Sequence, residues 1–507
     1  MRLKLVRGSD CLQYDTSRYM TLSYCWGGPQ QNQLTLANLN SYEIDIPWDD
    51  LPNTLKDAVI ATDRLGGRYL WIDSLCIIQN DDNDKAREIG LMAKVYTHSM
   101  LTIVAGRGDR ASDGFLHMRV LPSGTTKFLY QHDDGKQGHV ISIFPEIMTH
   151  ERKYEIDSRG WTMQEYILSP RLVIFGTWTT EWTCRARGAN PAQRHYKDGW
   201  HPPFLPHPQT ILDYSPKWNP SIKNVRSAHA ITNRSIQSSR LLDAAMFFSA
   251  NPSFDHPRPD FSTVFDTWND LIDLYTCRLL SDPKDRILAI SGLAERFASL
   301  LSPSERYAAG LWESDLLCGL NWRCKSGYSS PRPKEYQGPS WSWVSVNEEV
   351  WTSSPIDSPT TVLSCDCVVS DPSAPYGAVD SATLRIEGPS RSVEWRYEQQ
   401  DGWPNCPDIF EWRQRENGRK FGYHMDLDAR ENNTHWTEVI LLVLEYTKDG
   451  SPRGLVLIRD QEHQWSLAPA APSSSGPRAW CAAPYRRLGH FYGSQGEKWT
   501  NSVYTIV

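Results

Sequence analysis

Glu165, in the stretch SRGWTMQEYILSPR (158–171), stands in the setting of this chain that most favours chemistry. A short helix here would place Glu165 on one face with Trp161, four residues earlier, and with Leu168, three residues later. A carboxylate can stabilise positive charge that develops in a reaction, and a neighbouring indole can shape a pocket or stack on a flat ring. Glu165 is therefore the candidate catalytic residue, and Trp161 is a candidate ligand-binding residue.

The same stretch also offers Glu165 a purely structural role. Buried carboxylates usually have partners, and Arg159 and Arg171 flank Glu165 as candidates for an ion pair. Arg159, followed by Gly160, would also fix the loop that enters the helix. On the residues alone, the ion pair and the chemistry both stay open.

Asp73 and Cys76 lie in the apolar run YLWIDSLCIIQ (69–79), which is typical of a strand covered on both faces of a parallel sheet. Ligands of open α/β sheets bind at the carboxyl ends of such strands, so Asp73 is a candidate for contact with a ribose hydroxyl. A nucleophilic Cys76 would need a thiolate and a base, yet no histidine is near it in the sequence. Cys76 is kept as a candidate ligand-binding residue beside the simpler prediction of a buried, inert thiol.

Ser23, Trp26 and Gly27 lie at the end of the segment YMTLSYCW (19–26) and in the turn that follows it. This segment is short, apolar and rich in strand-forming residues, so it is predicted to be the first strand. Glycine at 27 permits either a close approach of the backbone to a ligand or a turn, and both interpretations stay open. All three residues are candidate ligand-binding residues.

Several familiar kinds of site have no support in the sequence. There is no Walker A motif, no GxGxxG and no GxSxG, and none of the eleven cysteines forms a CxxC pair. His195, His201 and His207 follow one another at a spacing of six in a segment rich in proline, which fits a solvated loop and no common metal-ligand pattern. No metal and no bound cofactor are expected.

The segments that must position these residues alternate between strand and helix patterns. LPNTLKDAVIATDRLGG (51–67) has apolar residues at helical spacing and ends in two glycines, and NDDNDKAREIGLMAKVYTHS (80–99) begins with acids, which favour a helix N-terminus. MLTIVAG (100–106) is a third predicted strand. The order strand–helix–strand–helix–strand predicts right-handed crossovers and a parallel sheet.

The remainder of the chain is predicted to contain three further regions of different secondary structure. We predict an α/β domain over 1–190, a loop-rich connection over 191–225, a helical region over 226–338 and a β-rich C-terminal region over 339–507. In the last region, TEVILLVLEYT and RGLVLIRD flank KDGSP and predict a hairpin. The fold class is thus α/β with a parallel sheet, followed by a mixed α+β region.

Composition limits the class of protein. A net charge of −7 argues against nonspecific binding to nucleic acid or to an anionic membrane. The N-terminus lacks a signal-peptide core, and no apolar run is long enough to span a bilayer. Scattered cysteines in odd number are typical of free thiols in a reducing compartment, which predicts a cytoplasmic protein.

Five segments in this order resemble the fungal heterokaryon-incompatibility (HET) domain: YMTLSYCWGG (19–28), LPNTLKDAV (51–59), LGGRYLWIDSLCIIQ (65–79), MAKVYTHSMLTIVA (92–105) and RGWTMQEYILSPRLVIFG (159–176). The resemblance implies a fungal protein of nonself recognition whose activation triggers programmed cell death. It also implies an unknown protein partner encoded at an incompatibility locus, and self-association.

A more distant resemblance is to the Toll/interleukin-1 receptor (TIR) domain. Many TIR domains carry, after the third strand, a helix with a tryptophan followed four residues later by a glutamate, as at Trp161 and Glu165. In the TIR domains that consume NAD this glutamate is catalytic, which implies by analogy that Glu165 assists cleavage of NAD as a substrate. Such cleavage passes through an oxocarbenium-like centre that a carboxylate can stabilise.

Two other functions remain open beside this one. The domain could be an interaction module that oligomerises on a signal without catalysis, and the burial of Glu165 would discriminate, because a catalyst needs a reachable pocket. It could also be an enzyme of fungal secondary metabolism on the same scaffold, for which the expected sign is a deep cavity lined by some of the 21 tryptophans and 22 tyrosines.

Overall fold

The chain consists of two compact units, Met1–Pro257 and Arg258–Val507. The computed structural model describes residues 2–8, 19–30, 32–118, 126–131, 137–142, 154–177, 180–184, 261–325, 331–352, 357–398, 409–413, 424–428, 436–460, 484–493 and 498–507. The helix patterns within 226–260 and the residues His195, His201 and His207 lie outside these ranges. No helix among the described residues is long and apolar enough to cross a membrane.

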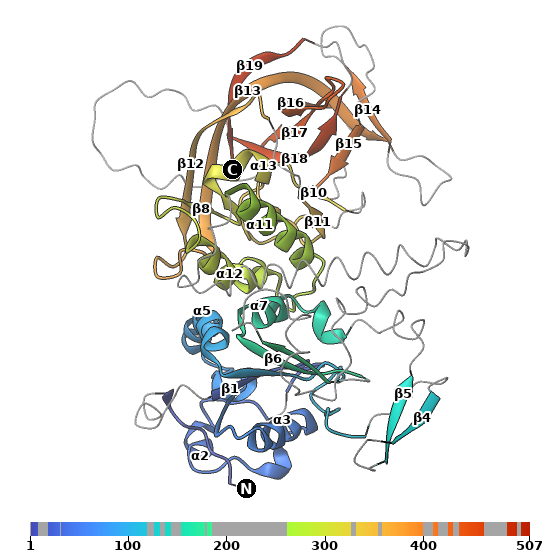
Figure 1. Ribbon diagram of the computed structural model, residues 1–507. Coiled ribbons are helices and arrows are strands. Elements are labelled where there is room, and N and C mark those ends of the chain that lie inside the picture. The colour runs from blue at the N-terminus through green and yellow to red at the C-terminus, as the bar shows by residue number, and fades with distance from the viewer. Residues whose placement is uncertain are drawn as a thin grey trace. The chain divides into compact units, whose positions relative to one another are not determined.

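The first unit is built on a five-stranded sheet in the order β2-β1-β3-β6-β7 (Figure 1). Its strands are β1 (Tyr19–Ser23), β2 (Tyr69–Trp71), β3 (Leu101–Val104), β6 (Arg171–Phe175) and β7 (Thr180–Cys184). The first four are parallel, and β7 adds to β6 in the antiparallel direction. The prediction of an α/β unit with a parallel sheet is confirmed, and an antiparallel strand extends that sheet at one edge.

Three helices cover the two faces of this sheet. In Figure 1, α5 (Asp82–His98) and α7 (Gly160–Leu168) lie on one side and α3 (Asn53–Arg64) lies on the other. The helix α5 begins where the sequence predicts, because the Asp81 carboxylate accepts hydrogen bonds from the backbone N–H groups of Asn83 and Asp84. The helix α3 is followed by Gly66, whose φ of +77° suits a residue without a Cβ.

The two faces of the sheet differ in chemistry because strand side chains alternate. Met20, Leu22 and Tyr24 enter the main apolar core of the unit, together with Leu101 and Ile103. Burial of one such side chain contributes about 1.5–3 kcal/mol to folding. Thr21 and Ser23 of β1 and Thr102 of β3 point to the second face and carry hydroxyl groups. This hydroxyl-lined face is the one that receives α5 and α7.

The apolar run 69–79 is not one long strand. Only Tyr69–Trp71 forms β2, and Asp73–Cys76 forms a single helical turn, α4. The prediction that Asp73 and Cys76 belong to the strand is therefore wrong, although both directly follow its carboxyl end. The periodicity of a short apolar run cannot distinguish a strand from a buried helical turn.

Smaller elements complete the described part of the first unit. They are the helix α2 (Leu39–Tyr42), the 3₁₀ turns η2 (Trp48–Asp50) and η3 (Glu155–Ser158), and the antiparallel pair β4 (Thr126–Gln131) and β5 (Gln137–Ser142). The turn η3 leads directly into α7 and ends at Ser158, so Arg159 occupies the N-cap position of α7.

The second unit combines helices with a large, mainly antiparallel sheet. Its helices are α11 (Phe261–Thr276), α12 (Leu288–Ala298) and α13 (Leu316–Gly319), and its 3₁₀ turns are η4 (Pro283–Arg286), η5 (Glu313–Asp315) and η6 (Trp343–Ser345). Two short pairs, β8 (Tyr307–Ala308) with β9 (Leu311–Trp312) and β10 (Arg323–Cys324) with β11 (Val350–Trp351), accompany them.

The large sheet has eight strands, of which six follow the order β12-β13-β16-β17-β18-β15. They are β12 (Thr361–Val369), β13 (Val379–Glu398), β16 (Thr437–Tyr446), β17 (Pro452–Arg459), β18 (Tyr485–Tyr492) and β15 (His424–Leu427), with β14 (Ile409–Arg413) on β13 and β19 (Thr500–Ile506) on β13 and β18. Figure 1 shows β13 as a long, bent strand. The predicted hairpin is confirmed, since β16 and β17 pair antiparallel across KDGSP.

Candidate functional site

Glu165 lies on the hydroxyl-lined face of the first unit, in the last part of α7. Its side chain is only 6% exposed. The hydroxyl of Ser23, the last residue of β1, donates a hydrogen bond of 2.5 Å to the Oε2 atom of Glu165. The helix thus places the carboxylate at the carboxyl end of the strand that the sequence predicts to be first.

Further hydroxyl groups lie next to the contact between Ser23 and Glu165. The Ser169 hydroxyl donates to the backbone carbonyl of Glu165 at 2.6 Å, and its oxygen lies 2.5 Å from the hydroxyl oxygen of Thr102 on β3. Thr21 on β1 joins the same group, 2.7 Å from Thr102. Because every hydroxyl has a partner inside the unit, the layer between sheet and α7 is polar without being strained.

The environment of Glu165 favours its protonated form. Burial raises the pKa of Glu165 to about 7, opposed by the nearby positive charge of Arg159 and by hydrogen bonds from Ser23 and Tyr96. Asp73 is a further negative charge that raises the pKa. Near neutral pH, Glu165 therefore exchanges between carboxyl and carboxylate, which is the property required of a general acid or base.

The two arginines proposed as ion-pair partners of Glu165 make different contacts. Arg171 donates from Nη1 to the backbone carbonyl of Met100 at 3.1 Å, so its predicted pairing with Glu165 is wrong. Arg159 donates from Nη1 to the backbone carbonyl of Tyr24, and its charge also lowers the pKa of both Glu165 and Asp73. The guanidinium therefore serves two carboxyl groups and the end of β1 together.

Asp73 opens the turn α4 and holds Trp26. The indole Nε1 of Trp26 donates to Oδ2 of Asp73 at 2.9 Å, and the Ser74 backbone N–H donates to Oδ1 at 2.7 Å. Burial raises the pKa of Asp73, against the lowering effects of Arg159 and of these hydrogen bonds. Tyr24 extends the group by donating to the Ser74 hydroxyl at 2.8 Å.

Gly27 is required by the backbone of the loop that follows β1. Its φ is +69°, a value that L-residues with side chains rarely adopt, and a Cβ at this position would overlap the side chain of Arg110. Of the two interpretations that the sequence leaves open, the structure supplies a physical basis for the turn. Gly27 itself is exposed, next to the half-buried Trp26.

The structure gives less support for a chemical role of Cys76 and Trp161. Burial raises the pKa of the Cys76 thiol to about 12, so a thiolate does not form near neutral pH and a nucleophilic role is disfavoured. Trp161 is half-buried in the first turn of α7. The face of α7 opposite Glu165 is also buried, with Met163 1% and Ile167 2% exposed.

The sheet order explains why these residues converge. The chain passes from β1 to β2 on one side and then returns past β1 to β3, so the direction of winding reverses between β1 and β3. Ligands of doubly wound sheets bind in the crevice at this reversal, beyond the carboxyl ends of the strands. Ser23 faces Val104 at the ends of these two strands, and Asp73 follows β2 at the same edge.

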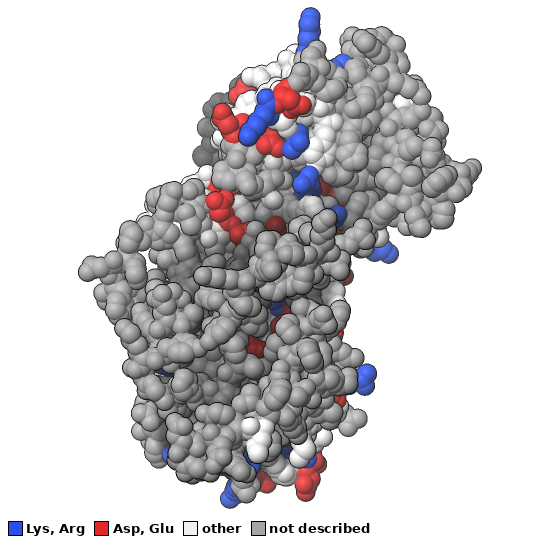
Figure 2. All heavy atoms as spheres, turned by 45° about the vertical axis from the view of Figure 1, so that its right-hand side comes forward, with Lys and Arg blue, Asp and Glu red and all other residues white. Residues whose placement is uncertain are grey.

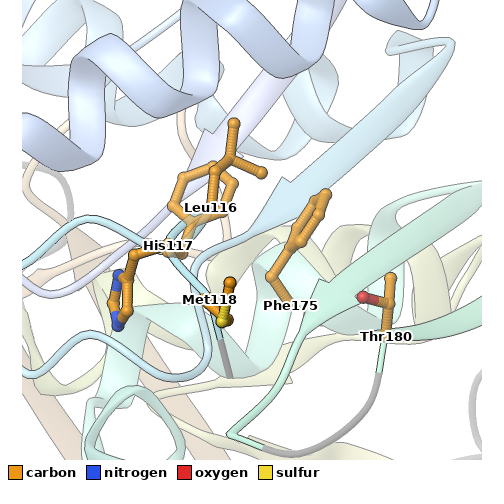
Figure 3. A pocket seen from close by; sticks show the side chains of 6 residues that line it. Leu116, His117, Met118, Phe175 and Thr180 are labelled. Atoms are coloured by element: carbon orange, nitrogen blue, oxygen red, sulfur yellow. The ribbon is translucent and has the colours of Figure 1, made fainter. Parts of the chain in front are cut away.

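A separate cavity of about 300 Å³ lies on the other face of the sheet. Phe175 from the end of β6 and Thr180 from β7 border it on one side, and Leu116, His117 and Met118 from the segment after β3 border it on the other (Figure 3). Its aromatic rings belong to the apolar core that contains Met20 and Leu22. Glu165 does not line it, so this cavity is separate from the candidate site around Glu165.

The sequence does not reveal two contributors to the site region. The Tyr96 hydroxyl donates to the Leu22 carbonyl at 3.1 Å, and a hydrogen bond from Tyr96 lowers the pKa of Glu165. Asp57 lies in α3 on the opposite face of the sheet. Its Oδ2 accepts the backbone N–H groups of Phe115 and Leu116 at 2.6 and 2.8 Å and so holds the segment after β3.

Several of the rings that a deep cavity would require are core residues instead. Five tryptophans of the second unit are buried completely, or nearly so: Trp268, Trp322, Trp341, Trp343 and Trp395. Among the described residues, no group of three or more His, Cys, Asp or Glu side chains is arranged to hold a metal ion.

Fold and site together define the class of the first unit: a doubly wound α/β domain with a buried carboxyl group at the reversal of its winding. Residues 19–165 match the family model described as heterokaryon incompatibility protein (HET), a span that begins with β1 and ends at Glu165. The chain therefore carries a HET domain. No curated protein and no solved structure matched it.

Proposed function

We propose that this protein acts in fungal nonself recognition and programmed cell death, and that its HET domain hydrolyses NAD with Glu165 as the catalytic carboxyl group. The proposal follows the likeness to TIR domains in the spacing of Trp161 and Glu165. The observation that carries it is the pKa of Glu165, which burial raises to about 7 at the reversal of the sheet. Structural ion pairs, by contrast, normally hold a carboxyl group ionised.

The proposed hydrolysis would need the Glu165 carboxylate and a water molecule. As the bond between nicotinamide and ribose breaks, its electron pair leaves with nicotinamide, and the ribose carbon acquires oxocarbenium character. The ionised form of Glu165 stabilises that positive charge, and the oxygen of a water molecule then bonds to the carbon and releases a proton. Arg159 and Asp73 lie close enough to influence the charge of Glu165.

A second candidate function is supported by the burial of the same side chain. A catalyst needs a carboxylate that a substrate can reach, and Glu165 is 6% exposed. In this alternative the HET domain is a non-catalytic module that self-associates or binds a protein partner, and the contact of Glu165 with Ser23 joins α7 to β1.

The deciding experiment is incubation of the purified full-length protein with NAD, with detection of released nicotinamide. Glu165→Gln and Glu165→Ala are compared with Glu155→Gln, which changes an exposed glutamate in the turn just before α7. Because a cell-death effector can be silent until it assembles, each protein is assayed at low and at high concentration.

The outcomes separate the two candidates. If both Glu165 variants lose turnover while Glu155→Gln keeps it, and Glu165→Gln does not melt at a lower temperature than the unaltered protein, Glu165 is catalytic. If turnover is absent from the unaltered protein at every concentration and Glu165→Ala melts several degrees lower, the NAD proposal fails and the structural module stands. The larger effect of alanine is expected because it leaves the Ser23 hydroxyl without its acceptor.

A further inference from the structure

Five side chains of the second unit form an alternating row of cations and aromatic rings. In order they are Lys325, Trp351, Arg323, Tyr492 and Arg453, and we call them the cation–aromatic row. The Lys325 Nζ lies 5.7 Å from the centre of the Trp351 ring. The guanidinium of Arg323 lies 5.7 Å from that ring and 6.0 Å from the Tyr492 ring, and that of Arg453 lies 5.3 Å from the Tyr492 ring. These distances are those of cation–π contacts.

Strand pairing builds the row from distant parts of the sequence. Arg323 on β10 faces Trp351 on β11 in one ladder, and Arg453 on β17 faces Tyr492 on β18 in another. A hydrogen bond from Nη1 of Arg323 to the Tyr492 hydroxyl joins the two ladders. The row is accessible to solvent, since Trp351 is 42% exposed and the side chains of Lys325 and Arg453 are 46% and 42% exposed.

The charges in the row are only partly neutralised. Lys325 pairs with Glu349 at 2.6 Å, and Arg453 lies 4.0 Å from Glu445. Among the described residues, Arg323 has no carboxylate within 4.0 Å, and its hydrogen-bond acceptor is the neutral phenol of Tyr492. Three cations against two carboxylates leave a local positive charge in a chain whose net charge is −7.

A buried histidine beneath the row is subject to the same positive potential. His490 is 3% exposed, and its ring centre lies 5.1 Å from that of Tyr492. Burial lowers the pKa of His490 well below its ordinary value, and the charges of Arg487, Arg323 and Arg453 lower it further. Its Nε2 lies 2.5 Å from Oδ1 of Asn321, whereas its Nδ1 has no hydrogen-bond partner among the described residues.

We propose that the cation–aromatic row binds a nucleotide, a ligand that combines a flat base with a phosphate ester. The base would stack on the exposed indole of Trp351, since stacking on aromatic rings accepts every base. The phosphate would be held by Arg323 and Arg453, because guanidinium groups match phosphate oxygens in geometry and charge. The row thus supplies both halves of nucleotide recognition without a glycine-rich loop.

The surroundings favour a small ligand over a nucleic-acid strand. A long polyanion requires a continuous basic surface. Here Glu349 pairs with Lys325, and Glu445 lies 4.0 Å from Arg453. On the described part of the face that Figure 2 presents, Asp and Glu lie among Lys and Arg.

Calorimetric titration of the full-length protein tests the proposal, with AMP and ADP as probes. Adenosine lacks the phosphate and ribose 5-phosphate lacks the base, so both should bind at least about fivefold more weakly than AMP. Trp351→Ala and Arg453→Gln should each weaken AMP binding by about fivefold or more.

Two matched variants control for nonspecific effects. Trp182→Ala removes an equally exposed tryptophan, 44% exposed, from β7 of the first unit. Arg459→Gln removes another arginine of β17, which lies 5.9 Å from the Tyr485 ring and faces Tyr485 on β18 just as Arg453 faces Tyr492. Both controls, and Glu165→Gln, should bind AMP like the unaltered protein.

Several results would overturn the proposal. These are no binding of AMP or ADP at millimolar concentration, equal binding of AMP and adenosine, or equal losses in Arg453→Gln and Arg459→Gln. Affinity for oligonucleotides that rises steadily with their length would also overturn it, because that behaviour belongs to a strand-binding surface. Since AMP is one half of NAD, the losses in Trp351→Ala and Arg453→Gln, and not AMP binding alone, locate the site in the row and separate this result from NAD hydrolysis at Glu165.

Discussion

Each unit of this protein buries a carboxyl group, but the two groups are held in opposite ways. Asp428, directly after β15, is 1% exposed and meets Arg487, which is 0% exposed. The guanidinium donates to both carboxylate oxygens of Asp428, at 2.6 and 3.0 Å. It also donates to the carbonyls of Leu320 and Trp322, at 2.6 and 2.5 Å, and stacks on the Trp322 ring at 3.7 Å.

Glu165 has no such direct two-pronged contact in the described structure; its carboxylate accepts a short hydrogen bond from Ser23. A guanidinium bonded to both oxygens supplies the counter-charge of a carboxylate and joins separate segments of the chain. Hydroxyl groups stabilise the charged form less, so burial dominates and the pKa of Glu165 rises to about 7. The contrast teaches that burial alone does not mark a candidate functional carboxyl group, whereas burial without a directly bonded cation raises the pKa toward neutral and does mark one.

The largest effect is expected from Asp428→Asn. The neutral amide leaves the buried charge of Arg487 without its counter-charge, which should lower the free energy of unfolding of the second unit by about 3–5 kcal/mol. Urea denaturation followed by tryptophan fluorescence measures the change. Asp366→Asn, at an exposed position of β12, is the control. Equal unfolding midpoints for the two variants would contradict the structural role of the Asp428–Arg487 pair.

Glu165→Gln should stabilise the folded protein where Asp428→Asn destabilises it, and the size of this effect should depend on pH. Since the pKa of Glu165 is raised from an ordinary 4.5 to about 7, the folded protein holds this proton where the unfolded chain has lost it. The stabilisation is complete below pH 4.5 and is lost as the pH rises through 7. Glutamine does not titrate, so the Glu165→Gln variant does not lose this stability as the pH rises.

The measurement is urea unfolding of both proteins between pH 4.5 and 8. The free energy of unfolding of Glu165→Gln, relative to the unaltered protein, should rise by about 3 kcal/mol across this range. A difference that stays constant with pH would show that Glu165 is ionised throughout, like a paired structural carboxylate, and would remove the contrast with Asp428.

Ser23→Ala should give the smallest effect. Loss of the hydrogen bond to Oε2 removes an interaction that lowers the pKa of Glu165, so the midpoint of the stability–pH curve should move up by roughly 0.5–1 pH unit. Thr21→Val is the control, because the Thr21 hydroxyl contacts Thr102 and not Glu165. A midpoint that moves equally in both variants would mean that the whole hydroxyl layer, and not Ser23, sets the pKa.

Local pattern was enough to predict much of the first unit. Apolar spacing and end signals predict the helices within 51–67 and 80–99, and short β-rich runs predict the strands within 19–26 and 100–106. The short helix considered within 158–171 is α7, and KDGSP predicts the hairpin of β16 and β17. These features depend on residues close together in the chain, so sequence carries them directly.

What the sequence determined by itself is therefore the order of the elements, the α/β class and the residue types at the edge of the sheet. Only the tertiary structure decided which of those residues meet. Ser23 and Glu165 are 142 residues apart, and neither their contact nor the burial that raises the pKa of Glu165 follows from local spacing. The pairing of Arg487 with Asp428 and the alternation of rings and cations around Arg323 likewise arise from strand ladders between distant segments. Desolvation and charge proximity are properties of the packed chain, because they depend on what surrounds an atom in space.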